Sequence, residues 1–175
     1  MAAEAPVFEK LFRACRRSAV HLEMRDAYMP SDPMFIAWQK DRSIDHAADP
    51  EWQPWLDFVS EVVGRGVEVR RARIVSEPVS EYIRFEHAVT DMNVRAGEQV
   101  RWLARRRATD LALPGNDFWL FDEETLLVNH FDGDGEWQSE GGTEVVTDPA
   151  VIKLCATAFG AVWDRATPHE DYRPA

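Results

Sequence analysis

Arginine residues are the strongest candidates for ligand binding in this sequence. Arg71 and Arg73 stand two positions apart in an apolar run at 67–75, so on a strand they share one face. An arginine cluster at the carboxyl end of a sheet can bind a phosphate or a carboxylate through paired hydrogen bonds. Together with residues that follow this strand and the next, the expected ligand-binding set is Arg71, Arg73, Ser76, Glu77 and Arg105. The alternative is that these arginines neutralise the acidic hairpin predicted at 117–131.

Two histidines have carboxylates close enough in sequence for acid–base chemistry. His21 and Glu23 share a face of a predicted strand and could form an acid–base pair, or simply a polar strand face in contact with arginines. His130 ends a predicted strand and could act as a general base oriented by Asp132 or Asp134. The alternative for His130 is a solvated imidazole in a turn.

A glycine-rich turn carries three alternating acids, Asp132, Asp134 and Glu136. Oxygen ligands at this spacing could hold Mg²⁺ or Ca²⁺. The calcium-loop pattern is not met, because Trp137 and Thr143 occupy the positions of its glycine and its last glutamate. Hairpin turns rich in Asp and Gly are common for conformational reasons. We therefore predict neither a metal site nor a cofactor, and keep these three acids as the weakest candidates.

Composition points to a cytoplasmic protein of ordinary size. The 175 residues are 45% hydrophobic and 11% aromatic, enough for a real core. No stretch approaches the roughly 20 apolar residues of a membrane span, and the first ten residues do not resemble a secretory signal. Cys15 and Cys155 fall on apolar helix faces, which predicts buried thiols in a reducing compartment.

Charge is spread unevenly along the chain. The net charge is −11, which argues against direct nucleic-acid binding. Residues 65–107 nevertheless contain ten arginines and six acids, whereas residues 108–152 contain eleven acids and no Lys or Arg. The two segments either neutralise each other within the fold or present a charged surface to a partner.

The order of predicted elements favours an α/β fold. A helix at 53–63, a glycine turn, a strand at 67–75, a helix at 79–91 and a strand at 98–103 form a parallel crossover unit. Further elements are a helix through 8–15, a strand at 20–25, a short helix at 34–39, a hairpin of 117–121 and 125–131, a third short strand that begins with 136–138, and a helix from Pro149. We expect one mixed sheet, parallel in its centre and antiparallel at the C-terminal hairpin, with helices packed on it.

The predicted organisation is a single domain over 1–175. Its core would span 6–166, and the polar stretch at 167–175 would be a loosely ordered tail.

Six stretches of this sequence resemble an uncharacterised actinobacterial family, the domain of unknown function numbered 6879. They are CRRSAVHLEMRD at 15–26, GVEVRRARIVSEP at 66–78, AGEQVRWL at 96–103, LPGNDFWLFD at 113–122, NHFDGDGE at 129–136 and ATPH at 166–169. The resemblance covers nearly the whole chain. It implies a small cytoplasmic protein encoded near helix-turn-helix regulators, and hence a regulatory or adaptor role.

The resemblance also implies a fold distantly similar to phospholipase D. The catalytic signature of that superfamily is a His followed two positions later by Lys, with an Asp further on. The chain has three lysines, Lys10, Lys40 and Lys153, and none stands two positions after a His. Because Asp132 takes that position after His130, the resemblance implies the fold without the phosphodiesterase chemistry.

Three functions remain open on the sequence. The leading expectation is a non-catalytic regulatory or adaptor protein that binds a helix-turn-helix regulator, a small anionic ligand, or both. The second is an enzyme acting on a phosphate-bearing small molecule, with Arg71, Arg73 and Arg105 on the phosphate and His130 as general base. The third is a homodimer that serves only as a scaffold.

Overall fold

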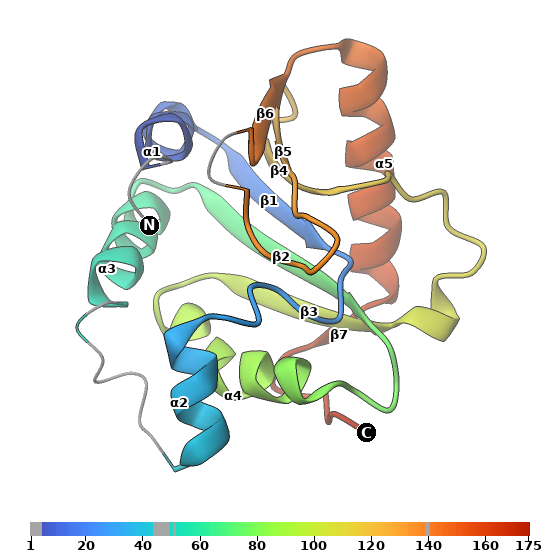
Figure 1. The fold of residues 1–175 in the computed structure, drawn as a ribbon. Helices are drawn as coiled ribbons and strands as arrows, with labels where there is room; N and C mark the ends of the chain where they lie inside the picture. The colour runs from blue at the N-terminus through green and yellow to red at the C-terminus, as the bar shows by residue number, and fades with distance from the viewer. Residues whose placement is uncertain (1–4, 44–49, 51, 139–140) are drawn as a thin grey trace.

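A computed structural model describes residues 5–43, 50, 52–138 and 141–175, and these form a seven-stranded mixed sheet with helices on both faces (Figure 1). The strands are β1 (Ser18–Glu23), β2 (Glu68–Val75), β3 (Gln99–Ala104), β4 (Asp117–Phe121), β5 (Thr125–Asn129), β6 (Thr143–Val146) and β7 (Thr167–Pro168). Their order is β6-β5-β4-β1-β2-β3-β7, with β1, β2 and β3 parallel and the other pairs antiparallel. The predicted fold class is confirmed.

The helices divide between the two faces of the sheet. They are α1 (Ala5–Ala14), α2 (Pro33–Lys40), α3 (Gln53–Gly64), α4 (Glu81–Arg95) and α5 (Pro149–Arg165), and a short 3₁₀ turn, η2 (Arg105–Arg107), follows β3. Figure 1 shows α5 on one side of the sheet and the other four helices on the opposite side. In the described part of the chain, no helix is both long and apolar enough to cross a membrane.

Strand alternation assigns each side chain of the central strands to one face. Val20 and Leu22 pack under α5 with Phe159, while Ala19 and Trp119 pack under α1 and α3. A third apolar cluster lies under α2 and α4 and contains Trp102, Tyr82 and Phe85. On the face opposite α5, the polar side chains of β1 and β2 lie between the apolar cluster under α1 and α3 and the one under α2 and α4.

Helix boundaries follow the capping signals in the sequence. The Asp32 side chain accepts from the N–H of Met34 at the start of α2, and Ser80 accepts from Ile83 at the start of α4. Asp148 caps α5 in the same way, with proline as its first residue. Cys15 and Cys155 are both buried, as predicted.

The third strand of the antiparallel part was predicted at the wrong place. It is β6, at 143–146, whereas 136–138 contributes only an isolated bridge between Phe131 and Trp137. The Asp132 carboxylate accepts the N–H groups of Asp134 and Glu136 at 2.9 Å each. These bonds curl the backbone into a turn, so pairing with β5 resumes only beyond Gly141.

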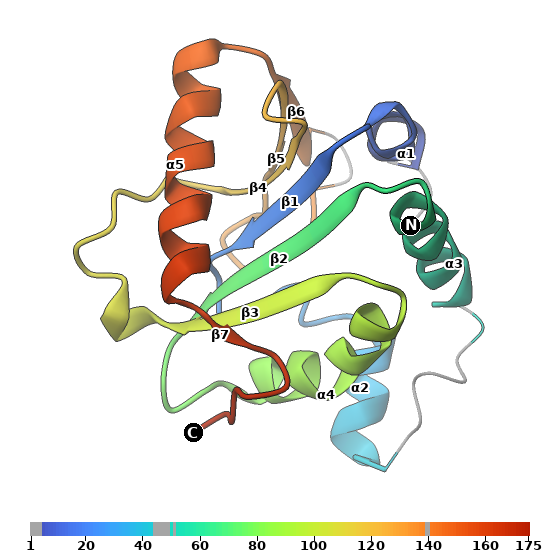
Figure 2. The same cartoon turned by 180° about the vertical axis from the view of Figure 1, so that it is seen from behind.

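The prediction of a loosely ordered tail was also wrong. Thr167 and Pro168 pair with β3, and His169 and Tyr172 are buried. The Trp102 indole N–H donates to His169 Nδ1 at 3.1 Å, and the other imidazole nitrogen lies 2.9 Å from Asp91. Figure 2 shows this segment beside β3 and α4. The tail is therefore part of the apolar cluster under α4.

Candidate functional site

The predicted arginine pair lies inside the protein. Arg71 Nε is 2.7 Å from Glu98 and its Nη1 is 3.0 Å from Glu23. Arg73 Nε is 2.9 Å from Glu23 and its Nη1 is 2.5 Å from Glu86. At most 16% of any of these five side chains is exposed. The arginines are neutralised, but by carboxylates of β1, α4 and the turn before β3, not by the acidic hairpin.

Aromatic rings enclose the two guanidinium groups. Arg71 lies over the Trp119 ring at 5.7 Å and Arg73 over the Trp102 ring at 5.1 Å. Burial lowers the pKa of both arginines, but the carboxylates around them outweigh burial and raise the pKa overall. Both guanidinium groups therefore stay charged and paired in the core, out of reach of a ligand.

His21 and Glu23 meet in the same buried layer. Nδ1 of His21 is 3.5 Å from Glu23, and its ring stacks on Trp119. That separation is too long for a good hydrogen bond, and neither imidazole nitrogen has a hydrogen-bond partner in the described structure. Burial, Arg71 and Arg73 lower the pKa of His21 well below its usual value. His21 is therefore neutral, and the pair has no access to a substrate.

The other predicted arginine, Arg105, lies at the carboxyl rim of the parallel strands. Its Nε donates to the Ser76 hydroxyl at 3.0 Å, and its Nη2 donates to Met24 O at 2.7 Å and Ile74 O at 3.2 Å. The Asp26 carboxylate is 3.3 Å from the same Nη2 and also accepts both the N–H and the hydroxyl of Ser76. Nη1 has no acceptor among the described residues, and 41% of the side chain is exposed. Arg105 is thus held rigidly with one donor group unused.

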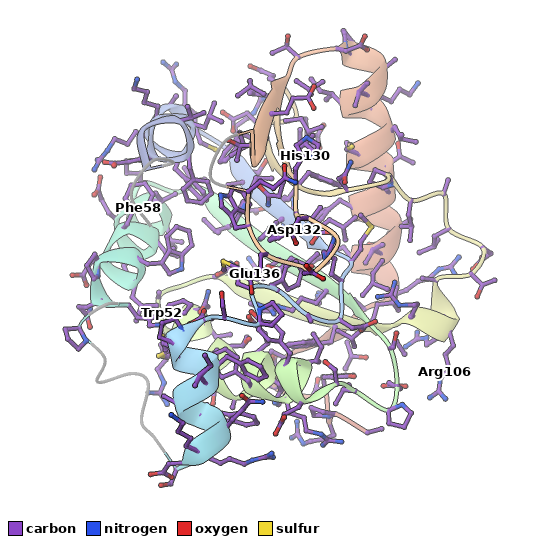
Figure 3. The ribbon with its side chains drawn as sticks, viewed as in Figure 1. Trp52, Phe58, Arg106, His130, Asp132 and Glu136 are labelled. Atoms are coloured by element: carbon purple, nitrogen blue, oxygen red, sulfur yellow. The ribbon has the colours of Figure 1, made fainter. Side chains whose placement is uncertain are left out.

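Glu77 belongs to a different environment. Its carboxylate is 2.9 Å from Arg106 and accepts the Tyr172 hydroxyl at 3.1 Å. Arg106 is 79% exposed and lies at the outer edge of the molecule (Figure 3). The five predicted ligand-binding residues are therefore divided among the core, the rim and the contact with the C-terminal segment.

A cavity of about 280 Å³ opens at the rim beside Arg105. Its polar and aromatic lining comes from Arg25, Arg105, Asn116, Asp117, Asn129 and Phe131. Arg25 follows β1 and Arg105 follows β3, Asn116 and Asp117 precede and begin β4, and Asn129 and Phe131 end and follow β5. The cavity therefore lies at the edge of the sheet where α/β proteins commonly bind ligands. Of these residues, only Arg105 was predicted from the sequence as part of a ligand site. The missed signal was that the residues after β1, and the Pro-Gly loop before β4, must reach the same rim.

Asp117 is the buried polar group of this cavity. Its Oδ1 accepts the Met24 N–H at 3.0 Å, and its Oδ2 accepts the Tyr28 hydroxyl. Burial is the main cause that raises the pKa of Asp117 to about 6, against the hydrogen bond from Tyr28 and the charge of Arg25. Arg25 lies over the Phe131 ring at 5.1 Å and has no carboxylate within ion-pair distance among the described residues.

The predicted base His130 does not line this cavity. Its Nε2 is 3.2 Å from Glu144 on β6, so Glu144 takes the place expected for Asp132 or Asp134. Asp132 bonds backbone amides of its own turn, and Glu136 accepts the N–H and hydroxyl of Ser31. In Figure 3, His130 lies apart from the labelled acids Asp132 and Glu136. Within the described ranges, no group of three His, Cys, Asp or Glu side chains is placed to hold a metal ion.

The fold is similar to those of several solved structures. Nuc from Salmonella typhimurium, a phospholipase D family member, matches with a TM-score of 0.50 and 10% identity over 98% of this chain and 94% of its own. NucT from Helicobacter pylori matches at 0.49 and 12% over 92% and 89%. TrmBL2, an archaeal chromatin protein, matches at 0.48 and 14% over 93% of this chain, which spans about half of TrmBL2 (49%). The predicted phospholipase D-like architecture is confirmed.

Sequence comparison assigns the chain to a family. No curated protein sequence matches it. A family model described as a domain of unknown function, DUF6879, matches residues 6–174, nearly the whole chain and all the elements that surround the rim cavity. The chain therefore belongs to the DUF6879 family.

Proposed function

We propose that this protein is a non-catalytic binding protein whose rim cavity takes a small anionic ligand. The observation that carries the proposal is the state of Arg105, held by Ser76, Met24, Ile74 and Asp26 with its Nη1 donors unused beside the cavity. A guanidinium group fixed before binding loses little side-chain entropy when an anion arrives. Arg25 adds a second positive charge to the same wall.

The lining of the cavity disfavours the enzyme alternative. Phospholipase D-type chemistry needs a histidine and a lysine, and neither type is among the described residues that line this cavity. His130 pairs with Glu144, and His21 is enclosed in the core beneath the helices. The side chains present can bind and orient an oxyanion, but they include no nucleophile with an adjacent base.

A charged surface supports the regulatory part of the proposal. Glu124 and Glu144, which lie within ion-pair distance of Arg17 and His130, are 73% and 62% exposed. The stretch between residues 108 and 152 contains eleven acids and no Lys or Arg. Such a surface complements a basic protein surface. We extend the proposal to an actinobacterial helix-turn-helix regulator as the partner, with the ligand changing the affinity of the complex. Affinity purification from an actinobacterial lysate should then recover such a regulator in stoichiometric amount, and its absence would remove this extension.

Calorimetric titration with inorganic phosphate tests the ligand-binding proposal. Wild-type protein should bind phosphate, and Arg105→Gln should weaken the affinity by at least about tenfold, because a charge-assisted hydrogen bond is lost. Arg107→Gln is the matched control, since Arg107 is an exposed neighbour on η2 that does not line the cavity. Equal affinities of the two variants, or no phosphate binding by wild type, would overturn the proposal.

A further inference from the structure

The rim cavity contains a carboxylate as well as two guanidinium groups. Asp117 is the one acid among its described lining residues and is only 3% exposed. Arginine can only donate hydrogen bonds, whereas an ionised carboxylate can only accept them. A site for a bare anion gains nothing from a carboxylate in its wall, so the presence of Asp117 constrains the ligand.

Asp117, which lines the cavity, retains hydrogen-bonding capacity. Its two oxygens accept one bond each, from the Met24 N–H and from the Tyr28 hydroxyl. A carboxylate has about four acceptor positions, so about two remain. A ligand O–H group directed at Asp117 would use one of them, while a ligand oxygen without hydrogen would face a like charge in a poorly solvated wall.

We infer that the cavity selects an oxyanion that carries its own hydrogen-bond donor, such as hydrogen phosphate, over one that carries none, such as sulfate. The inference rests on the proposed anion-binding function and specifies its ligand class. Arg25 and Arg105 attract the charge shared by both anions, and Asp117 accepts from the O–H that only hydrogen phosphate has. The selectivity therefore comes from Asp117, and the general affinity comes from the arginines.

The protonation state of Asp117 makes the selectivity depend on pH. The charged or titratable groups that surround it are Glu23 and Tyr28, and Arg25 and Arg105 in the cavity. With a pKa of about 6, the carboxyl group is an acceptor near pH 8. Below that pKa it is protonated and donates a hydrogen bond, which sulfate can accept. The preference for phosphate should shrink as the pH falls.

Titration of wild-type protein with inorganic phosphate and with sulfate at about pH 8 and about pH 5 tests the inference without any variant. At the higher pH, phosphate should bind at least about tenfold more tightly, the effect of one hydrogen bond to a charged group. At the lower pH sulfate, which is a dianion at both pH values, should bind severalfold more tightly than at the higher pH, because the protonated Asp117 donates to it. Equal affinities at the higher pH would overturn the selectivity while leaving the proposed function intact, and failure of both anions to bind would overturn the proposed function itself.

Asp117→Asn provides a second, independent measurement. The amide keeps an acceptor for the Met24 N–H and adds a donor, so sulfate should bind nearly as well as phosphate at about pH 8. Asp134→Asn is the matched control, because it removes one exposed acid that does not line the cavity and should keep the wild-type ratio. If Asp117→Asn folds, with a melting transition like that of wild type, and still discriminates as wild type does, the assignment to Asp117 is wrong.

Discussion

Replacing Arg71 with methionine tests whether the buried ion pairs belong to the core or to a ligand site. The substitution keeps a long apolar stem and removes the charge. Among the described residues, the fully buried side chain of Glu98 then retains only the 2.8 Å hydrogen bond from Asn93. Glu23 keeps Arg73 at 2.9 Å. The cost of the substitution therefore falls mainly on Glu98.

The magnitude follows from the burial of the Glu98 carboxylate. Removing one partner of a buried ion pair leaves an uncompensated charge in a medium of low dielectric, which usually costs roughly 3–5 kcal/mol. The hydrogen bond from Asn93 remains in the variant and keeps part of the stabilisation of the carboxylate. The loss should therefore fall at the lower end of that range.

Urea denaturation measures the prediction for Arg71→Met. Near pH 7 the variant should lose roughly 3–4 kcal/mol of unfolding free energy relative to wild type. Combining Arg71→Met with Glu98→Gln should recover part of the loss near pH 7, since no uncompensated charge remains.

The refuting result is equally clear. A loss below roughly 1 kcal/mol near pH 7 would show that Glu98 is solvated and that the arginine layer is accessible. Phosphate titration of the folded variant gives an independent readout. Arg71→Met should keep wild-type affinity, because Arg71 does not line the rim cavity.

Three further substitutions test other parts of the structure. Asp122→Ala should cost about 2 kcal/mol in urea denaturation, because that carboxylate accepts three backbone N–H groups at the start of β1. Burial raises the pKa of Asp122, but the three hydrogen bonds outweigh burial and lower the pKa overall. The carboxylate therefore contributes to stability above the ordinary aspartate pKa of about 3.9, and this contribution is lost as the pH falls below that value. His169→Ala should shift Trp102 fluorescence toward longer wavelength, because the C-terminal segment that covers Trp102 detaches. An unchanged spectrum would contradict the burial of Trp102 by that segment. Gly97→Ala should destabilise by at least about 1 kcal/mol, measured by thermal unfolding, because φ is +104° and a Cβ would lie 3.0 Å from Val63.

The parallel centre of the fold was predictable because local signals agreed there. The strand at 67–75 lies between a glycine turn and a capped helix, and β2 occupies Glu68–Val75 of that range. The edges were harder to predict. β6 has four residues, two of them polar or charged, and its position depends on how the preceding turn is closed by Asp132. The burial of His169 depends on Trp102, 67 residues away, so no local pattern predicts it.

The candidate site was predictable to the level of the sheet edge but not of the side chains. Arg105 and Ser76 lie together at the rim, as the rule for strand ends predicts. Alternation showed that Arg71 and Arg73 share a face, but it could not show that α4 covers that face and supplies Glu86. Asp117 was read only as the first residue of a hairpin strand. Its proximity to the rim arises from the antiparallel pairing of β4 with β1, which sequence spacing does not reveal.

The buried layer and the rim cavity are two consequences of one strand register. Pairing of Glu23 with Arg73 places the end of β1 beside β2, and pairing of Ile74 with Leu103 brings β3 alongside. Arg105 then reaches the carbonyl oxygen of Ile74 in β2 and that of Met24, which follows β1. A slip of either strand would separate charges in the core, and the low dielectric there makes that slip costly. The arginines that the sequence suggested as ligand-binding groups thus support the site indirectly, by holding the strands whose ends position the arginine that faces the cavity.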